Sequence, residues 1–143
     1  MAEIKRNAVV PYTPAQMYEL VNRIEDYPDF LPWCKQSDVH ERTEDEVRAS
    51  LTLAKGGIEK SFTTLNRMQH NKMIEVRLIS GPFNHLEGFW LFEPIGDKMC
   101  KVLLDLEFEL ANNIFSLALG PIFQQIANSL VDAFCQRAKQ VYG

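Results

Sequence analysis

The sequence predicts an α+β fold in which an antiparallel sheet of about six or seven strands is covered by one long C-terminal helix. From Asn113 to Tyr142, apolar residues recur at steps of three and four, which is typical of an amphipathic helix. Between Val47 and Leu110 the apolar period falls to two, with a turn about every ten residues. Because no second helix of similar length is expected, the sheet must receive the apolar face of this helix.

The N-terminal part of the chain is expected to form an edge strand followed by one or two short helices. Residues 4–10 form a short mixed segment that Pro11 ends, which suits an edge strand. The pair Thr13-Pro14 then supplies a cap residue and a proline at the first helical position. This helix should end near residues 23–26. Two prolines in the following turn allow only one more helical turn, around residues 29–31.

The strands of the predicted sheet are separated by turns rich in glycine, proline and asparagine. Because these turns are short, sequential antiparallel pairing is the simplest topology. The alternating segments are residues 47–53, 58–68, 73–79, 86–92 and 102–110. The turns between them are expected at Gly56-Gly57, Gln69–Asn71, Gly81-Pro82 and Pro94–Asp97.

The predicted C-terminal helix is longer than the strands that would receive it. Thirty helical residues span about 45 Å, whereas ten strand residues span about 33 Å. A break at Gly120-Pro121 would leave about 22 helical residues, or about 33 Å, to match the sheet. We therefore expect a kink there, with residues 114–119 near one mouth of the space enclosed between helix and sheet.

The composition favours one cytoplasmic domain that spans residues 1–143. A chain of 143 residues can bury about 68% of its unfolded surface, so it needs no disulfide or metal to fold. The net charge of −4 and the scattered Lys and Arg residues disfavour DNA as a partner. The three cysteines lie far apart, which favours a reducing compartment. Neither a signal peptide nor a membrane-spanning apolar run is recognisable.

The sequence contains no motif typical of catalysis or metal binding. His40, His70 and His85 stand in three different segments, and no nucleophile motif such as GxSxG is present. Neither HExxH nor paired CxxC spacing occurs, so no metal site is predicted. Beside the Gly81-Pro82 turn, His85 and Glu87 are the only candidates for an acid and a base, and we expect neither to be catalytic.

Several segments along the chain form a recognisable series. They are Val9-Val10-Pro11-Tyr12, Met17-Tyr18-Glu19-Leu20-Val21, Tyr27-Pro28-Asp29-Phe30-Leu31-Pro32-Trp33-Cys34, Lys60-Ser61-Phe62-Thr63-Thr64, Gly81-Pro82-Phe83-Asn84-His85-Leu86 with Trp90 and Phe92, and Ala133-Phe134 with Arg137-Ala138. In this order they resemble the START-like proteins of the coenzyme Q-binding group. The most similar branch is the bacterial one labelled ribosome association toxin or oligoketide cyclase, within the polyketide cyclase/dehydrase superfamily. The resemblance implies a START/Bet v 1-like helix-grip fold.

Our leading hypothesis is the non-enzymatic binding of a hydrophobic ligand in a cavity between the sheet and the C-terminal helix. The broad apolar face of that helix and the many aromatic residues suggest such a cavity. The resemblance implies that the ligand is ubiquinone or a related isoprenoid lipid, and that the protein supports respiratory electron transport. The expected lining residues are Phe30, Trp33, Phe62, Phe83, Trp90, Phe92, Phe115, Leu119, Phe123 and Ile126.

A transient contact with the membrane surface would follow from the handling of a ligand that resides in the bilayer. Residues 27–34 and 114–119 are the expected contact points, because both would lie near the mouth of the cavity. The protein would then be cytoplasmic and peripheral at the inner face of the membrane.

Two alternatives to ligand binding are implied by the resemblance. The first is binding to the large ribosomal subunit, which would block the joining of the subunits and inhibit translation initiation. It would need a local basic face, for which the candidates are Lys5, Arg6, Lys35, Arg42 and Lys60. The second is a cyclase or dehydrase acting on a polyketide-like substrate, which would need an acid or base that faces the cavity.

Overall fold

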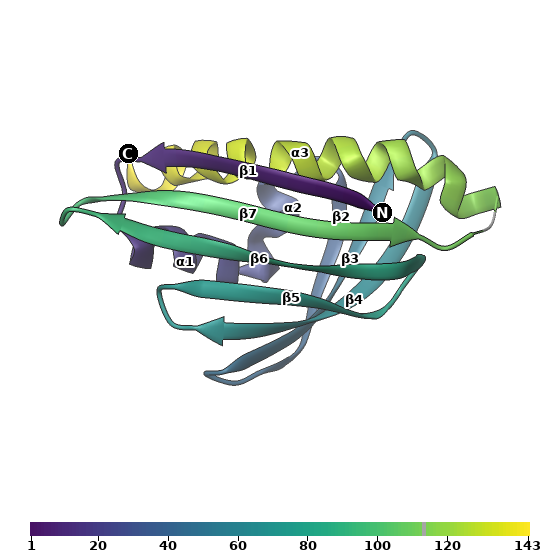
Figure 1. Ribbon diagram of the computed structural model, residues 1–143, viewed down its shortest axis with the longest axis horizontal. Helices are drawn as coiled ribbons and strands as arrows, with labels where there is room; N and C mark the ends of the chain where they lie inside the picture. Colours follow the sequence, from purple (N-terminus) through teal and green to yellow (C-terminus); the bar gives the residue numbers. More distant parts are fainter. Residues whose placement is uncertain (113) are drawn as a thin grey trace.

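The computed structural model describes residues 1–112 and 114–143, except for the side chains of residues 114–116. Seven antiparallel strands form a single curved sheet, and the long helix α3 lies along one side of it (Figure 1). This arrangement confirms the predicted α+β helix-grip fold. In chain order the elements are β1 (Ala2–Val10), α1 (Pro14–Asn22), the 3₁₀ turn η1 (Ile24–Asp26), α2 (Tyr27–Phe30), β2 (Cys34–Arg42), β3 (Glu46–Lys55), β4 (Ile58–Gln69), β5 (Met73–Ser80), β6 (Phe83–Ile95), β7 (Met99–Leu110) and α3 (Ile114–Tyr142).

The strand order is β1-β7-β6-β5-β4-β3-β2, so the predicted sequential pairing holds from β2 to β7 and is wrong for β1. The helices between β1 and β2 carry the chain across to the far edge of the sheet. As a result β1 pairs with β7, with Ile4 opposite Leu106. The prediction of β1 as an edge strand is confirmed. The sequence did not delimit β2, because most of its residues are exposed and no clear alternation marks it.

The start of α1 is fixed by the capping that the sequence predicts. The Thr13 hydroxyl accepts from the Gln16 amide at 3.2 Å, and the Gln16 side chain accepts from the Thr13 amide at 2.8 Å. This reciprocal pair satisfies two of the donors that a helix N-terminus leaves unpaired. The apolar face of α1 is buried, with Met17 fully enclosed.

Two prolines lie within elements of the structure: the turn predicted at Pro94 is wrong, whereas the kink predicted at Gly120-Pro121 agrees with the inclined first turns of α3 (Figure 1). Strand β6 continues through Pro94, opposite Cys100, to Ile95, although a turn was expected from Pro94 onwards. The loss of one donor is tolerated there because the strand ends one residue later. Helix α3 likewise continues through Pro121, and its first turns are inclined to the longer remainder (Figure 1). Because proline has no N–H, Pro121 leaves the carbonyl of Leu117 without its helical hydrogen-bond donor. Leu117 is 66% exposed.

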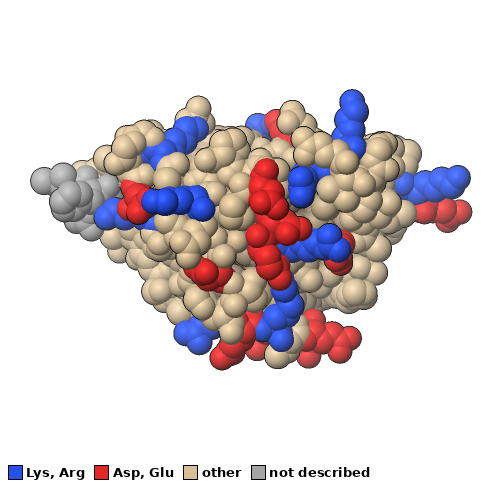
Figure 2. Space-filling model, turned by 180° about the vertical axis from the view of Figure 1, so that it is seen from behind, with Lys and Arg blue, Asp and Glu red and all other residues tan. Residues whose placement is uncertain are grey.

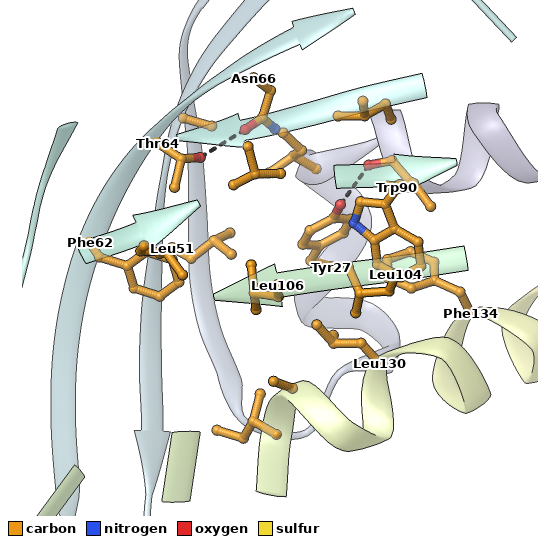
Figure 3. Close-up of a pocket in the computed structure, with 18 of the residues that line it drawn as sticks. Tyr27, Leu51, Phe62, Thr64, Asn66, Trp90, Leu104, Leu106, Leu130 and Phe134 are labelled. Carbon is orange, nitrogen blue, oxygen red and sulfur yellow. Dashed lines mark hydrogen bonds between the residues drawn. The ribbon is translucent and has the colours of Figure 1, made fainter. Parts of the chain in front are cut away.

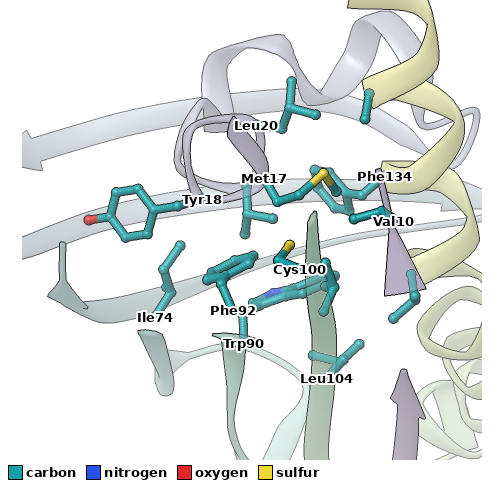
Figure 4. Close-up of a cluster of buried hydrophobic side chains, with 14 of the residues drawn as sticks. Val10, Met17, Tyr18, Leu20, Ile74, Trp90, Phe92, Cys100, Leu104 and Phe134 are labelled. Carbon is teal, nitrogen blue, oxygen red and sulfur yellow. The ribbon is translucent and has the colours of Figure 1, made fainter. Parts of the chain in front are cut away.

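The interior contains two hydrophobic clusters that meet beneath α3. The first joins α1 to the central strands and includes Met17, Phe92 and Phe134 (Figure 4). The second joins the N-terminal half of α3 to the other end of the sheet and includes Phe83 and Phe123. Aromatic rings meet edge-to-face in both clusters, as between Phe83 and Phe123, whose centroids are 4.9 Å apart. Both clusters therefore attach α3 to the sheet.

Arg42, at the end of β2, holds the chain between α1 and α2. Its guanidinium donates to both carboxylate oxygens of Glu25, and its Nη2 also donates to the Asn22 carbonyl at 2.8 Å. We call these contacts the Arg42 clasp. Because hydrogen bonds from Arg42 favour the charged carboxylate, the pKa of Glu25 lies below its ordinary value.

Gly88 in β6 is predicted to be intolerant of any side chain. A Cβ atom at this position would lie 2.1 Å from the Asp105 carbonyl oxygen and 2.8 Å from the Leu106 Cα, so the backbone of β7 would have to move. We expect Gly88→Ala to lower the free energy of unfolding by about 3 kcal/mol. Gly120→Ala in α3 is the matched control, because its Cβ would meet open space, and it should raise stability by up to about 1 kcal/mol. Urea unfolding, followed by circular dichroism, measures the stability of both variants. If Gly88→Ala unfolds at the same urea concentration as the wild-type protein, the close approach of β6 to β7 at Gly88 is contradicted.

The Arg42 clasp is predicted to make stability depend on pH in the acid range. Since the pKa of Glu25 is depressed by folding, the stabilisation is present above the ordinary value of 4.5 and is lost as the pH falls through the lowered value. A double-mutant cycle of Arg42→Met and Glu25→Gln should give a coupling of about 0.5–1 kcal/mol at neutral pH, because both side chains are partly exposed. The same cycle on the more exposed Lys35–Glu59 pair should give almost none. A coupling that persists unchanged to the lowest accessible pH would contradict this assignment.

Candidate functional site

An apolar cavity of about 100 Å³ lies between the sheet and α3, where the two hydrophobic clusters meet (Figure 3). Strands β3 to β7 supply the floor, and α3 supplies the roof with residues from Phe123 to Phe134. The segment from α1 to α2 closes one end through Val21, Ile24 and Tyr27. The Arg42 clasp grips this same segment at Asn22 and Glu25, so it fixes that wall of the cavity.

Polar groups on the cavity wall are few, and most have partners. The Tyr27 hydroxyl donates to the Val21 carbonyl at 2.5 Å, and the Thr64 hydroxyl donates to the Asn66 side-chain oxygen at 3.0 Å (Figure 3). Burial raises the pKa of Tyr27 far above its ordinary value, so the phenol stays neutral. The indole N–H of Trp33 is buried and has no acceptor among the described residues. Since Trp33 is among the residues that line the cavity, a ligand or a water could accept from this donor.

Half of the ten residues predicted from the sequence lie on this wall. They are Trp33, Phe62, Trp90, Phe123 and Ile126. Phe115 falls outside the described side chains. Whether any of these residues contacts a ligand stays a prediction.

The other four predicted residues are placed elsewhere by packing. Phe30 stacks edge-to-face on Phe134 and lies beneath the guanidinium of Arg137, 4.9 Å from the ring centroid. Phe83 and Leu119 belong to the cluster around the N-terminal half of α3, and Phe92 lies in the cluster beneath α1. These side chains fill the core on either side of the cavity because their neighbours leave no space between them.

Sequence reasoning missed most of the smaller lining residues. Leu51, Thr64, Asn66, Leu104 and Leu106 all point inward from neighbouring strands. The alternation of apolar and polar residues along each strand could have identified these lining residues, because residues two apart on a strand share one face of the sheet. The alternation does not show which inward residues border a void and which are tightly packed.

The two acid-base candidates, His85 and Glu87, lie on the opposite face of the sheet from the cavity. Leu86 between them lines the cavity, and successive strand residues point to opposite faces. No carboxylate, histidine, lysine or cysteine is among the described residues that line the cavity. The described wall therefore offers apolar contact and a few hydrogen bonds rather than acid-base chemistry.

Cys34 and Cys100 behave as small buried apolar residues. Burial raises the pKa of both Cys34 and Cys100 to about 11, so neither thiol is a nucleophile near neutral pH. Cys34 follows Trp33, and both side chains are enclosed.

The turn predicted to touch the membrane is largely folded inward. Leu31, Trp33 and Cys34 are buried, and Tyr27 and Phe30 are half-buried, so most of the apolar surface of this turn is not exposed. No helix among the described residues is long and apolar enough to cross a membrane. On the face shown in Figure 2, acidic side chains form a ridge through the middle with basic side chains on either side of it. The other predicted contact, residues 114–119, includes Leu117, which is 66% exposed, whereas the side chains of residues 114–116 lie outside the described part of the chain. Membrane contact stays a prediction.

Comparison with known proteins gives matches along almost the whole chain. The family described as polyketide cyclase/dehydrase and lipid transport matches residues 10–135. A protein named ribosome association toxin RatA from Pseudomonas aeruginosa is 49% identical over 98% of this chain and 97% of its own length. The RatA protein of Escherichia coli K12 is 42% identical over 99% of this chain and 90% of its own length.

More distant matches include one protein similar in sequence and two solved structures similar in fold. A Xenopus laevis protein named coenzyme Q-binding protein COQ10 homolog B, mitochondrial, is 26% identical over 99% of this chain and 59% of its own length. Among solved structures, the Zhui aromatase/cyclase of Streptomyces sp. R1128 shares 13% identity with a TM-score of 0.85, covering 99% of this chain and 96% of that chain. A START superfamily protein of Mycobacterium smegmatis shares 21% identity with a TM-score of 0.77, covering 97% and 98%.

These two solved structures establish the fold alone, because the same fold carries both binding proteins and enzymes. The matched family description likewise covers both cyclases and lipid transport. The extent of the family match and the identity with the RatA proteins settle the membership of the chain. It belongs to the polyketide cyclase/dehydrase and lipid transport family, and its relatives at 42–49% identity include proteins named ribosome association toxin RatA.

Proposed function

We propose that this protein binds the large ribosomal subunit and hinders the joining of the two subunits. The observation that supports the proposal is the 49% identity, over 98% of the chain, with a protein named for ribosome association. This identity extends over almost the whole chain, whereas solved structures that share the fold have identities as low as 11%. We therefore place ribosome binding first and the binding of a hydrophobic ligand second, which is the reverse of the order that the sequence alone suggested.

The binding surface would not be a simple basic patch. Of the five basic residues suggested by the sequence, Arg6 is paired with Asp132, and Lys35 and Arg42 are paired with glutamates. The net charge is −4, and on the face seen in Figure 2 a central group of acidic side chains separates the basic ones. Binding should therefore depend on shape and on specific contacts, with a weaker salt dependence than that of proteins that neutralise many phosphates.

Sedimentation of ribosomes with added protein tests this proposal. When purified subunits are mixed under conditions that favour joining, increasing amounts of protein should lower the joined fraction, and the protein should sediment with the large subunit. The Streptomyces aromatase/cyclase, which shares the fold at 13% identity, is the control and should have no effect. An unchanged ratio of free subunits to joined ribosomes at saturating protein would refute the proposal.

A second candidate function is the binding of a hydrophobic ligand that carries a hydrogen-bond acceptor, such as a quinone. The supporting observation is the buried Trp33 N–H without a described acceptor, in a wall that is otherwise mostly apolar. A quinone carbonyl is an acceptor, and its ring and isoprenoid tail suit aromatic and aliphatic contacts. Apolar burial would contribute about 25 cal/mol per Å² of ligand surface removed from water.

The size of the cavity limits which ligand can enter without a rearrangement. Its volume of about 100 Å³ lies below the roughly 300–1,000 Å³ of most ligand pockets. A ring-sized group is therefore the most that the cavity would receive as it stands. A long isoprenoid tail would require α3 or the segment between α1 and α2 to move outward.

Substitution of the two tryptophans separates a specific hydrogen bond from general apolar contact. With a short-tailed ubiquinone as the probe, Trp33→Phe should weaken binding about 2- to 10-fold, because one buried hydrogen bond is lost. Trp90→Phe is the control, because Trp90 also lines the cavity but its indole nitrogen is not a buried group without a partner. Equilibrium dialysis measures both variants. Failure of the wild-type protein to bind the quinone, together with purified protein whose organic extract holds no lipid or quinone, would refute this function.

A further inference from the structure

Three metal-ligating side chains converge on the outer face of the sheet, on the opposite side from the cavity. His85 and Glu87 stand two residues apart on β6, and Glu107 lies directly opposite Glu87 on β7. A shift in register between Phe83 and His85 adjusts the position of the histidine on this face. One ligand atom from each residue lies within 4.8 Å of those of the other two.

The distances within this cluster are too long for good hydrogen bonds. His85 Nε2 lies 3.5 Å from Glu107 Oε2 and 3.7 Å from Glu87 Oε1. A direct N–H to oxygen hydrogen bond would bring these atoms to about 2.7–3.2 Å. Two ligands of a tetrahedral zinc ion, each about 2.0–2.2 Å from the metal, stand about 3.4 Å apart. The two distances from His85 are therefore close to that of atoms that share an ion.

Two further features favour a cation at this position. The Nε2 atom of His85 is buried and has no hydrogen-bond partner among the described residues. Glu87 and Glu107 are a directly opposed pair of like charges, an arrangement that destabilises a sheet unless something offsets it. A divalent cation between them would accept the free nitrogen lone pair and neutralise both carboxylates.

The surroundings leave room to complete the coordination shell. The side chains of His85, Glu87 and Glu107 are 28%, 47% and 40% exposed. The two glutamates also border a hollow of about 500 Å³ on this face, which can admit water as a fourth ligand. Two other charged residues border the same hollow. Arg77, which pairs with Glu87 across β5 and β6, disfavours a cation because it is positively charged, whereas the carboxylate of Asp105 favours one.

We propose that His85, Glu87 and Glu107 bind one divalent transition-metal ion of the zinc class. One imidazole nitrogen and two carboxylates suit zinc, cobalt or nickel better than calcium or magnesium, which prefer oxygen ligands throughout. The ion would join β6 to β7 just after the shift in register, where Leu86 and Leu106 on the inner face line the cavity. This proposal is independent of ribosome binding and of the quinone.

Metal titration of the chelator-treated full-length protein tests the site. Zinc should bind with a stoichiometry of one, and cobalt in its place should give the visible absorption of a nitrogen- and oxygen-ligated ion. His85→Ala and Glu107→Gln should each weaken zinc binding by at least roughly tenfold, since loss of even a supporting residue has this effect at metal sites. The thermal midpoint of the wild-type protein should rise with added zinc, and that of His85→Ala should not.

Two matched controls make the outcome decisive. His70→Ala removes an exposed histidine elsewhere, and Glu75→Gln removes a carboxylate that borders the same hollow but lies outside the cluster. Both should bind zinc as the wild-type protein does. The proposal is overturned if the wild-type protein binds zinc no better than His85→Ala, or if the controls lose binding to the same extent. Glu107→Gln should remain folded, because it relieves the opposition of two like charges.

Discussion

The structure depends on the burial of one apolar helix face against one sheet. Among the described residues, α3 has 29 residues and no partner helix of comparable length, so its buried row, from Phe123 to Ala138, leaves water mainly against the strands, with the short helices α1 and α2 packed against its C-terminal part. This requirement accounts for the position of α3 along the curved sheet (Figure 1). It also explains the cavity, which lies where the two clusters that attach α3 to the sheet meet without filling the space between them.

The same pair of strands provides two chemically opposite environments. On β6 and β7, Leu86 and Leu106 face the cavity, whereas Glu87 and Glu107 face outward. The alternation of a strand thus separates an apolar compartment from a charged cluster by the thickness of a single sheet. A ligand inside and a cation outside would act on the same strands, although each is tested independently of the other.

The family matches and the cavity support different activities, and the two are compatible. Near full-length identity with RatA proteins supports action at the ribosome, which is a property of the outer surface. The enclosed apolar wall with a free indole N–H at Trp33 supports a small hydrophobic ligand, which is a property of the interior. A ligand larger than the cavity would have to displace α3 or the segment held by the Arg42 clasp, and either movement would alter the outer surface.

The sequence by itself determined the class of fold, the cap of α1, the long amphipathic α3 and most strands, because these follow from local periodicity and turn residues. It also identified the family through short segments spread along the chain. Only the tertiary structure decided that β1 pairs with β7, which aromatic residues border the void, and that Glu107 stands beside His85. These facts depend on contacts between residues far apart in the chain, and neither hydrophobic period nor motif spacing encodes such contacts.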